Sequence, residues 1–208
     1  MKIVKLDPVS NGVLLELGKI RSNGRGKLID LKLIEISGVF DFGERNIVLG
    51  NEILFFGSLE KFARYCCNAR KIPSLIMFSK KFDLNTFRNI IDSGVSKENV
   101  LLVGAENLSG EEISFLAENR IRRVSLNLFL EDIADACDVV MEFALGKELL
   151  FMFDFNAVDC FELSGISALQ SSYILSRVGL MKNLSIAYFS GMKENAEKIC
   201  ARLVSEVM

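Results

Sequence analysis

The chain has 208 residues, of which 50% are hydrophobic, and its mean hydropathy is +0.30. This length suits one domain, and the apolar content is too high for a disordered protein. The 25 lysine and arginine residues nearly balance the 27 aspartate and glutamate residues, so no basic surplus points to a nucleic-acid partner. Histidine is absent, which excludes Ser-His-Asp and Cys-His catalysis and His-ligated zinc or iron within this chain.

The five cysteines are scattered and form no C-x-x-C pair, which argues against zinc ribbons and thioredoxin-like redox motifs. We expect buried thiols in a reducing compartment. The first residues lack the apolar run of a signal peptide, and the longest strongly apolar stretch, 149–155, is far shorter than the ~20 residues of a membrane span. The sequence therefore predicts a soluble, cytoplasmic protein with no membrane partner.

The first 45 residues have a pattern of their own. Alternating apolar residues in 12–17 and 31–36 predict a hairpin or edge strands around a turn at 22–26. The Gly24-x-Gly26 pair in that turn lacks the third glycine and the following helix of a dinucleotide-binding fingerprint. No P-loop occurs elsewhere in the chain, so a nucleotide-binding protein is the weakest of the functions considered.

From residue 46 onward, short apolar runs alternate with amphipathic stretches. Continuous apolar runs are typical of strands that are covered on both faces. The predicted strands are Asn46–Leu49, Ser74–Phe78, Val100–Val103, Arg123–Leu126, Leu149–Phe153 and Leu184–Phe189. Helical spacing between them, with a capping-box pattern at Ser109 and Glu112, predicts helices on both faces of the sheet. The fold class is therefore α/β, a three-layer α/β/α arrangement with a mostly parallel sheet in a single domain.

The stretch 153–159 carries the sharpest polar feature of the sequence. Asp154 and Asn156 follow the most apolar predicted strand, at the carboxyl edge where open α/β sheets bind ligands. An extended backbone would point both side chains to the same side, where their oxygens could hold magnesium or manganese. Equally, Asp154 and Asp159 could simply cap the turns that follow.

A second polar cluster, Ser79 to Asp83, follows the strand that ends at Phe78. It lies at the same edge of the predicted sheet, so it could neighbour Asp154. Beside two carboxylates, the ammonium group of Lys81 could occupy the space that a metal cation would otherwise fill. A solvated loop is the simpler alternative.

The region from Asn46 to the C-terminus resembles the ureohydrolase superfamily, which includes arginase, agmatinase and formimidoylglutamase. The metal motif S-x-D-x-D-x-x-D-P of that family resembles residues 152–160, MFDFNAVDC, in which Asp154 and Asp159 keep the first and third aspartates. Residues 164–167, SGIS, resemble the family's glycine-glycine-leucine-serine turn before a helix. The resemblance implies an arginase-like fold in one domain over residues 1–208, with a divergent N-terminal part at 1–45.

The departures from the family pattern fall on its metal ligands. Asn156 replaces the second aspartate, while Ser79 and Lys81 replace an aspartate and a histidine of the family's D-A-H-x-D motif. Where another metal-binding histidine is expected, this chain has Ile53, and Tyr188 falls near the family's guanidinium-binding glutamate. The positions that correspond to the family's metal site are Ile53, Ser79, Lys81, Asp83, Asp154 and Asn156. Of six expected ligands, the resemblance leaves Asp83 and Asp154.

These substitutions lead to two functional hypotheses. In the first, the protein has lost the binuclear manganese site and the hydrolase activity, has no catalytic residue and no cofactor, and acts as a binding or interaction module, as a homo-oligomer or with a protein partner. A buried ion pair between Lys81 and Asp154 or Asp83 would replace the metal charge, and losing it would cost about 3–5 kcal/mol. In the alternative, Asp83, Asp154 and Asn156 hold a single manganese or magnesium ion that hydrolyses linear amidine or guanidino C–N bonds.

Overall fold

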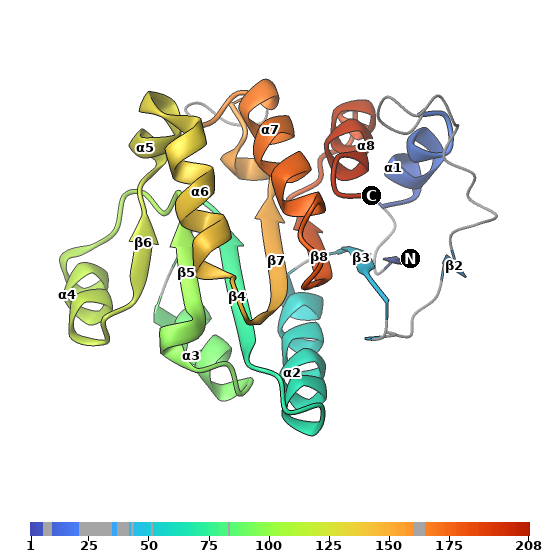
Figure 1. The fold of residues 1–208 in the computed structure, drawn as a ribbon. Coiled ribbons are helices and arrows are strands. Elements are labelled where there is room, and N and C mark those ends of the chain that lie inside the picture. Colours follow the sequence, from blue (N-terminus) through green and yellow to red (C-terminus); the bar gives the residue numbers. More distant parts are fainter. Residues whose placement is uncertain are drawn as a thin grey trace.

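The computed structural model describes residues 1–5, 10–20, 35–36, 42, 44–50, 52–82, 84–159 and 165–208. Its centre is an eight-stranded sheet in the order β2-β1-β3-β8-β7-β4-β5-β6 (Figure 1). Every pair of neighbouring strands is parallel. The strands are β1 (Lys2–Lys5), β2 (Glu35–Ile36), β3 (Asn46–Leu49), β4 (Pro73–Phe78), β5 (Val100–Val103), β6 (Arg122–Val124), β7 (Glu148–Asp154) and β8 (Leu184–Ser190).

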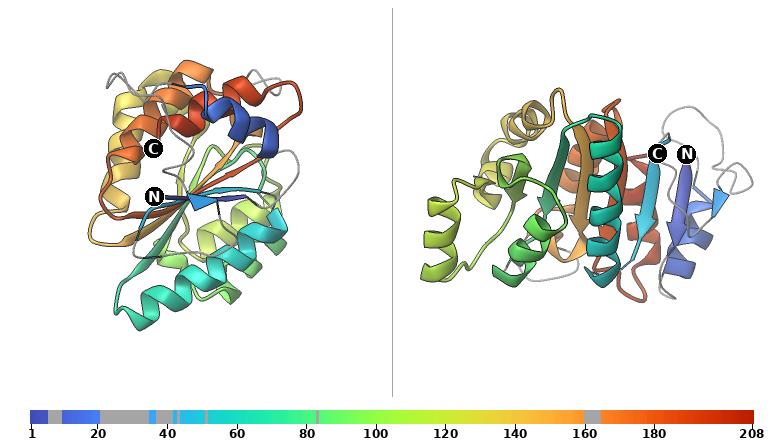
Figure 2. Two further views of the ribbon diagram at one scale, coloured as in Figure 1. Left: turned by 90° about the vertical axis from the view of Figure 1, so that its right-hand side faces the viewer. Right: turned by 90° about the horizontal axis from the view of Figure 1, so that it is seen from below.

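Helices cover both faces of the sheet, which makes three layers (Figure 2). One face carries α2 (Glu52–Asn68), α3 (Leu84–Asp92) and α4 (Gly110–Glu118). The other face carries α1 (Ser10–Leu17), α5 (Leu126–Glu131), α6 (Ile133–Phe143), α7 (Ala168–Gly179) and α8 (Glu197–Ser205). Parallel strands need such crossover helices, so the layers follow from the connectivity.

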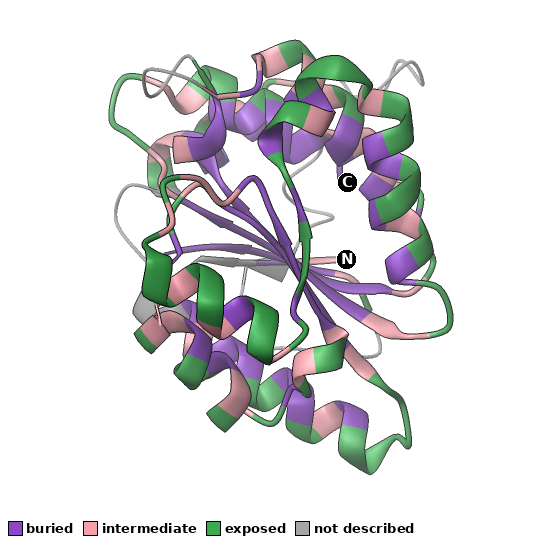
Figure 3. Ribbon diagram, turned by 90° about the vertical axis from the view of Figure 1, so that its left-hand side faces the viewer, coloured by how far each residue is buried: buried purple, intermediate pink, exposed green. Residues whose placement is uncertain are grey.

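The core lies on both sides of the central strands because their side chains alternate between the two faces. In β7, Leu149, Phe151 and Phe153 pack against the helices of the α6 and α7 face. Leu150 and Met152 pack toward α2 on the opposite face. Burying each such side chain contributes about 1.5–3 kcal/mol, and the helices turn their buried residues inward to meet them (Figure 3).

The three-layer parallel architecture expected from the sequence is confirmed. All six strands predicted from residue 46 onward are present, with bounds that differ by at most two residues. The strand expected at 12–17 is wrong, because this segment is helix α1. The predicted turn at 22–26 lies outside the described residues, whereas Glu35–Ile36 is an edge strand as expected.

Two helices begin with the capping chemistry that their sequences indicate. At α4, Ser109 Oγ accepts from the Glu112 amide at 3.2 Å while the Glu112 carboxylate accepts from the Ser109 amide at 2.7 Å. At α7, Ser167 and Gln170 form the same reciprocal pair. Each box satisfies amide groups that have no partner within the helix, which fixes where the helix starts.

Arg45 ties the start of β3 to the C-terminal part of the chain. Its guanidinium group donates to the carbonyl oxygens of Gly179 and Val207, both at 2.8 Å, and of Met181 at 2.9 Å. Burial lowers the pKa of Arg45 from its ordinary value. The Arg45 side chain therefore links the start of β3 to the ends of α7 and α8.

The cysteines depart in part from the expectation of buried thiols. Cys66, Cys137 and Cys200 are buried, whereas Cys67 is exposed. Cys160 lies outside the described residues. Within the described part of the chain, no helix has the length and apolar character needed to cross a membrane.

Candidate functional site

The candidate site lies at the carboxyl edge of the sheet, where β4 and β7 are neighbours. After β4 the chain continues into α3 on one face, and after β7 it continues into α7 on the other. Adjacent strands whose connections leave to opposite faces form the crevice in which α/β proteins bind ligands. Ser79 directly follows β4 and Asp154 is the last residue of β7, so both lie at this crevice.

Asp154 is the buried carboxylate of the site, with 5% of the residue exposed. Its Oδ2 accepts a hydrogen bond from Ser79 Oγ at 3.0 Å, and its Oδ1 accepts from the backbone amide of Asn156, also at 3.0 Å. The second bond caps the short 3-10 turn Phe155–Ala157. Of the two interpretations that the sequence left open, turn capping by Asp154 is therefore confirmed.

Ser79 is buried and joins the β4 loop to Asp154. Its hydroxyl donates to the carboxylate and accepts from the backbone amide of Lys81 at 3.2 Å. The Lys81 side chain is exposed, so the expectation of a buried lysine paired with Asp154 is wrong. Because the backbone turns at Ser79, the backbone amide of Lys81, rather than its ammonium group, faces the Ser79 hydroxyl. Asp83 lies outside the described residues, and so does the alternative pair between Lys81 and Asp83.

Gly191, which sequence reasoning missed, closes the site from the end of β8. Its φ of +69° is a conformation that favours glycine. A Cβ atom at this position would lie 2.2 Å from Asp154 Oδ1 and 2.7 Å from Asn156 Nδ2, so the backbone of Gly191 covers both side chains. A glycine two residues after the predicted strand Leu184–Phe189 was the signal that could have revealed it.

The structure brings together Ser79, Asp154 and Asn156 but does not place the other predicted positions with them. Ile53 belongs to the first turn of α2, and its side chain, like the whole of Asp83, lies outside the described part of the chain. Tyr188 is fully buried and meets Phe55 of α2 edge to face, with ring centroids 5.2 Å apart. Its ring therefore belongs to the core on the α2 face.

In the part of the chain that the structure describes, the groups at Asp154 are its own carboxylate, one hydroxyl and one carboxamide. Two dications need several anionic ligands and an oriented second shell. Among the described residues, no three His, Cys, Asp or Glu side chains are grouped so that they could hold a metal. What the arrangement offers chemically is hydrogen bonding at a buried, negatively charged strand end.

A second polar cluster lies at the opposite, amino-terminal edge of the sheet. Glu148 at the start of β7 accepts from Lys71 Nζ at 2.9 Å and from Ser185 Oγ. The hydrogen bond to Glu148 raises the pKa of Lys71. These contacts join β7, β8 and the segment before β4, and they stabilise the sheet at the edge away from the candidate site.

No protein-family model and no curated protein sequence matches the chain. Solved structures do match. The formiminoglutamase of Trypanosoma cruzi has a TM-score of 0.81 at 12% identity, covering 99% of this chain and 90% of that one. The formimidoylglutamase of Bacillus subtilis has a TM-score of 0.77 at 9% identity, covering 99% and 84%. The arginase of Bacillus cereus has a TM-score of 0.76 at 13% identity, covering 99% and 97%. The chain therefore has the arginase-like fold of the ureohydrolase superfamily.

Proposed function

We propose that this protein is a ureohydrolase-fold protein without the binuclear manganese centre and without hydrolase activity, and that it acts as a binding or interaction module. The observation that carries the proposal is the hydrogen bonding of the Asp154 carboxylate. Each of its two oxygens accepts a hydrogen bond from within the protein, from the Ser79 hydroxyl and from the Asn156 amide. The carboxylate thus links the loop after β4 to the turn after β7 through these two hydrogen bonds.

Charge balance supports the same proposal. Two divalent ions bring four positive charges, and a site that makes hydroxide at neutral pH must supply anionic ligands for them. Ser79 and Asn156 are neutral where the resemblance expects aspartates, and the exposed Lys81 adds positive charge at the rim. Asp154, together with the Asp83 that the resemblance also retains, would balance two of these four charges.

The alternative keeps a single metal ion and the hydrolysis of linear amidine or guanidino C–N bonds. One observation bears on it: Asp154 Oδ1 and Asn156 Nδ2 approach the same point beneath Gly191, so a flipped carboxamide would place its oxygen beside the carboxylate. A carboxylate and an amide oxygen are ligands that magnesium and manganese accept. The two functions therefore differ in metal stoichiometry and in turnover.

Dialysis of the purified protein against manganese, followed by elemental analysis, separates the two functions. We expect less than stoichiometric metal after removal of free ions, and no urea, ammonia or formamide release from arginine, agmatine or formimidoylglutamate. Bound stoichiometric metal with turnover would overturn the proposal.

A gain-of-site variant provides the matched control. In Ser79→Asp/Lys81→His/Asn156→Asp, new carboxylates approach Asp154, and their mutual repulsion should lower the melting temperature in EDTA. Manganese should restore that melting temperature, whereas it should leave the wild-type value unchanged. If manganese raises the wild-type melting temperature as much as that of the variant, the native residues already form a metal site.

A further inference from the structure

Three connections at the amino-terminal edge of the sheet each expose one aliphatic side chain. They lead from α2 into β4, from α6 into β7 and from α7 into β8, and these three strands are neighbours in the sheet. The exposed residues are Ile72, Leu145 and Leu180, which are 53%, 71% and 78% exposed. One exposed aliphatic residue is ordinary, but three in neighbouring connections along one edge indicate a contact surface.

Hydrogen bonds hold the three connections together as one row. The Asn183 carboxamide, just before β8, donates to the carbonyl oxygens of Ala144 at 2.8 Å and Lys147 at 2.7 Å. The backbone amide of Glu148, at the start of β7, donates to the carbonyl oxygen of Ile72 at 2.8 Å. The connections therefore keep fixed positions relative to one another, along one flank of the molecule (Figure 2, left).

Each of the three aliphatic residues has a cationic residue two positions away along the chain. These cations are Arg70, Lys147 and Lys182, and none of the ion pairs of the described residues includes them. Lys147 Nζ lies 3.9 Å from the centre of the Phe143 ring, and the guanidinium group of Arg122 lies 5.8 Å from the same ring. Burial and the charge of Arg122 lower the pKa of Lys147. Positive charges thus gather here without a paired carboxylate.

The carboxylates next to the row along the chain do not cancel this charge. Glu148 is already paired with Lys71 Nζ at 2.9 Å. Glu142, in the last turn of α6, is exposed and borders the row. Toward β5 and β6 the edge is mixed in sign, because Glu98 and Glu118 are exposed there. The basic row therefore ends at β4.

We propose that this row binds the surface of an anionic lipid membrane. The row comprises Arg70, Ile72, Leu145, Lys147, Leu180 and Lys182. The argument is charge complementarity: aliphatic side chains enter the boundary between headgroups and acyl chains, while neighbouring cations stay at the level of the anionic headgroups. A lipid surface accepts each aliphatic side chain separately, whereas a protein partner would have to supply a hollow for each of three separate turns.

A contact at the lipid surface needs no helix that crosses the membrane. The expectation of no membrane partner rested on the absence of a spanning segment, and no helix of the described residues could span. That absence concerns crossing the bilayer, whereas the row would contact it from outside. The inference does not depend on the proposed loss of hydrolysis either, since the row lies at the edge of the sheet opposite to Asp154.

Co-sedimentation of the full chain with lipid vesicles tests the proposal. Vesicles made of equal parts of phosphatidylserine and phosphatidylcholine should bind the chain, and added salt should weaken that binding. Vesicles of phosphatidylcholine alone should bind it more weakly by about tenfold or more, because they lack the negative surface charge. Equal binding to both kinds of vesicle overturns the proposal, and no binding to either overturns it in favour of an acidic protein partner.

The aliphatic contact has a matched control on α7. Leu180→Gln should weaken binding to the anionic vesicles about tenfold, because one inserted aliphatic side chain is lost. Leu169→Gln should leave binding unchanged. Leu169 is 81% exposed, much like Leu180, but it lies at the start of α7, at the carboxyl edge of the sheet. Equal losses in the two variants would contradict a contact through the amino-terminal edge.

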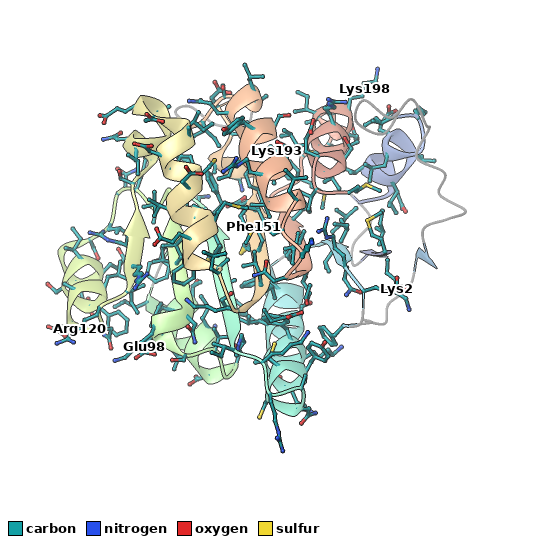
Figure 4. All side chains as sticks on the ribbon, viewed as in Figure 1. Lys2, Glu98, Arg120, Phe151, Lys193 and Lys198 are labelled. Carbon is teal, nitrogen blue, oxygen red and sulfur yellow. The ribbon has the colours of Figure 1, made fainter. Side chains whose placement is uncertain are left out.

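Single charges test the complementarity in both directions. Lys182→Gln should weaken binding to the anionic vesicles about fivefold, whereas Glu142→Gln should strengthen it by a similar factor, a gain that misfolding cannot produce. The control is Lys198→Gln, because Lys198 lies near the start of α8, at the upper end of the molecule in Figure 4 and at the carboxyl edge of the sheet. A Glu142→Gln variant that binds no more tightly, or a Lys198→Gln variant that loses as much as Lys182→Gln, would overturn the proposal.

Discussion

At the scale of single residues, the candidate site depends on how one carboxylate is satisfied. Asp154 is buried, and a buried carboxylate must have hydrogen-bond donors or a cation. Here the donors are the Ser79 hydroxyl and a backbone amide, and Gly191 leaves no room for a side chain above them. The Ser79 hydroxyl thus gives the buried carboxylate of Asp154 a direct hydrogen bond across two strand ends.

Ser79→Ala tests that bond. It leaves Asp154 Oδ2 buried without its hydroxyl donor, which should lower the free energy of unfolding by about 1–3 kcal/mol. Urea denaturation monitored by circular dichroism measures the loss. Lys81→Ala, two residues away in the same loop and exposed, should change the stability by less than about 0.5 kcal/mol. Equal losses in the two variants would contradict the assignment.

The sequence predicted which residues lie together at this edge, but it did not predict the orientation of their side chains. Placing Ser79 and Asp154 together needed strand periodicity and the rule that parallel strands end at one edge. The orientation of Lys81 depended on the backbone turn at Ser79, which pattern does not encode. Gly191 was missed because its role arises from a contact between segments far apart in the sequence.

At the scale of elements, the strands from residue 46 onward were predictable, whereas the elements of the first 45 residues were not. Strands such as β7 are continuous apolar runs, which buried parallel strands require. The segment 12–17 alternates in sequence, yet it forms α1, in which Val13, Leu14 and Leu17 are buried while Leu15 is 66% exposed. Periodicity fails in such short apolar segments because a helix and a strand can share the same few buried positions.

The hydrogen bonds of Arg45 give a prediction at this scale. Arg45→Lys keeps the charge but cannot reproduce the planar set of donors that reaches Gly179, Met181 and Val207. We expect a loss of about 2–3 kcal/mol, since hydrogen bonds to charged groups each contribute about 1.5–3 kcal/mol and are not additive. Hydrogen exchange should show faster opening of α8 and the end of α7.

A control of the same chemistry is Arg64→Lys on α2, where the arginine makes an exposed pair with Glu60. It should change the stability by less than about 0.5 kcal/mol. Unchanged exchange at α8 in Arg45→Lys would mean that the carbonyl groups find other partners.

At the scale of the whole molecule, alternating strands and helices predicted a parallel three-layer fold, but not the order of its strands. The edge strand β2, only two residues long, carries almost no signal, and β1 is confined to the first five residues. The order depends on how the chain crosses between faces, through α2 from β3 to β4 and through α7 from β7 to β8. These crossings are long-range choices that local pattern does not determine.

The two-sided core also predicts an alkaline limit to stability. Burial raises the pKa of Cys137 to about 11 and that of Cys66 to about 12. The unfolded chain would release these protons near pH 9 while the folded chain retains them, so the free energy of unfolding should fall as pH rises from about 9 toward 11. Cys137→Ala should make this decline shallower, and Cys67→Ala, at an exposed thiol, should leave it unchanged. Identical pH profiles for all three proteins would show that the buried thiols do not contribute.

The place of β3 in the sheet constrains the order in which the chain can assemble. β3 is paired with β1 on one side and with β8 on the other, so that Asn46 is held against Ile186. During synthesis, β4 to β6 and then β7 can pair as they emerge, but β3 must wait for nearly the last strand to be made. Until then the edge of β3 that faces β8 leaves its backbone N–H and C=O groups open to other chains, and such long-range pairing is slow. We therefore expect the strands that are synthesised first to take their final place in the sheet last.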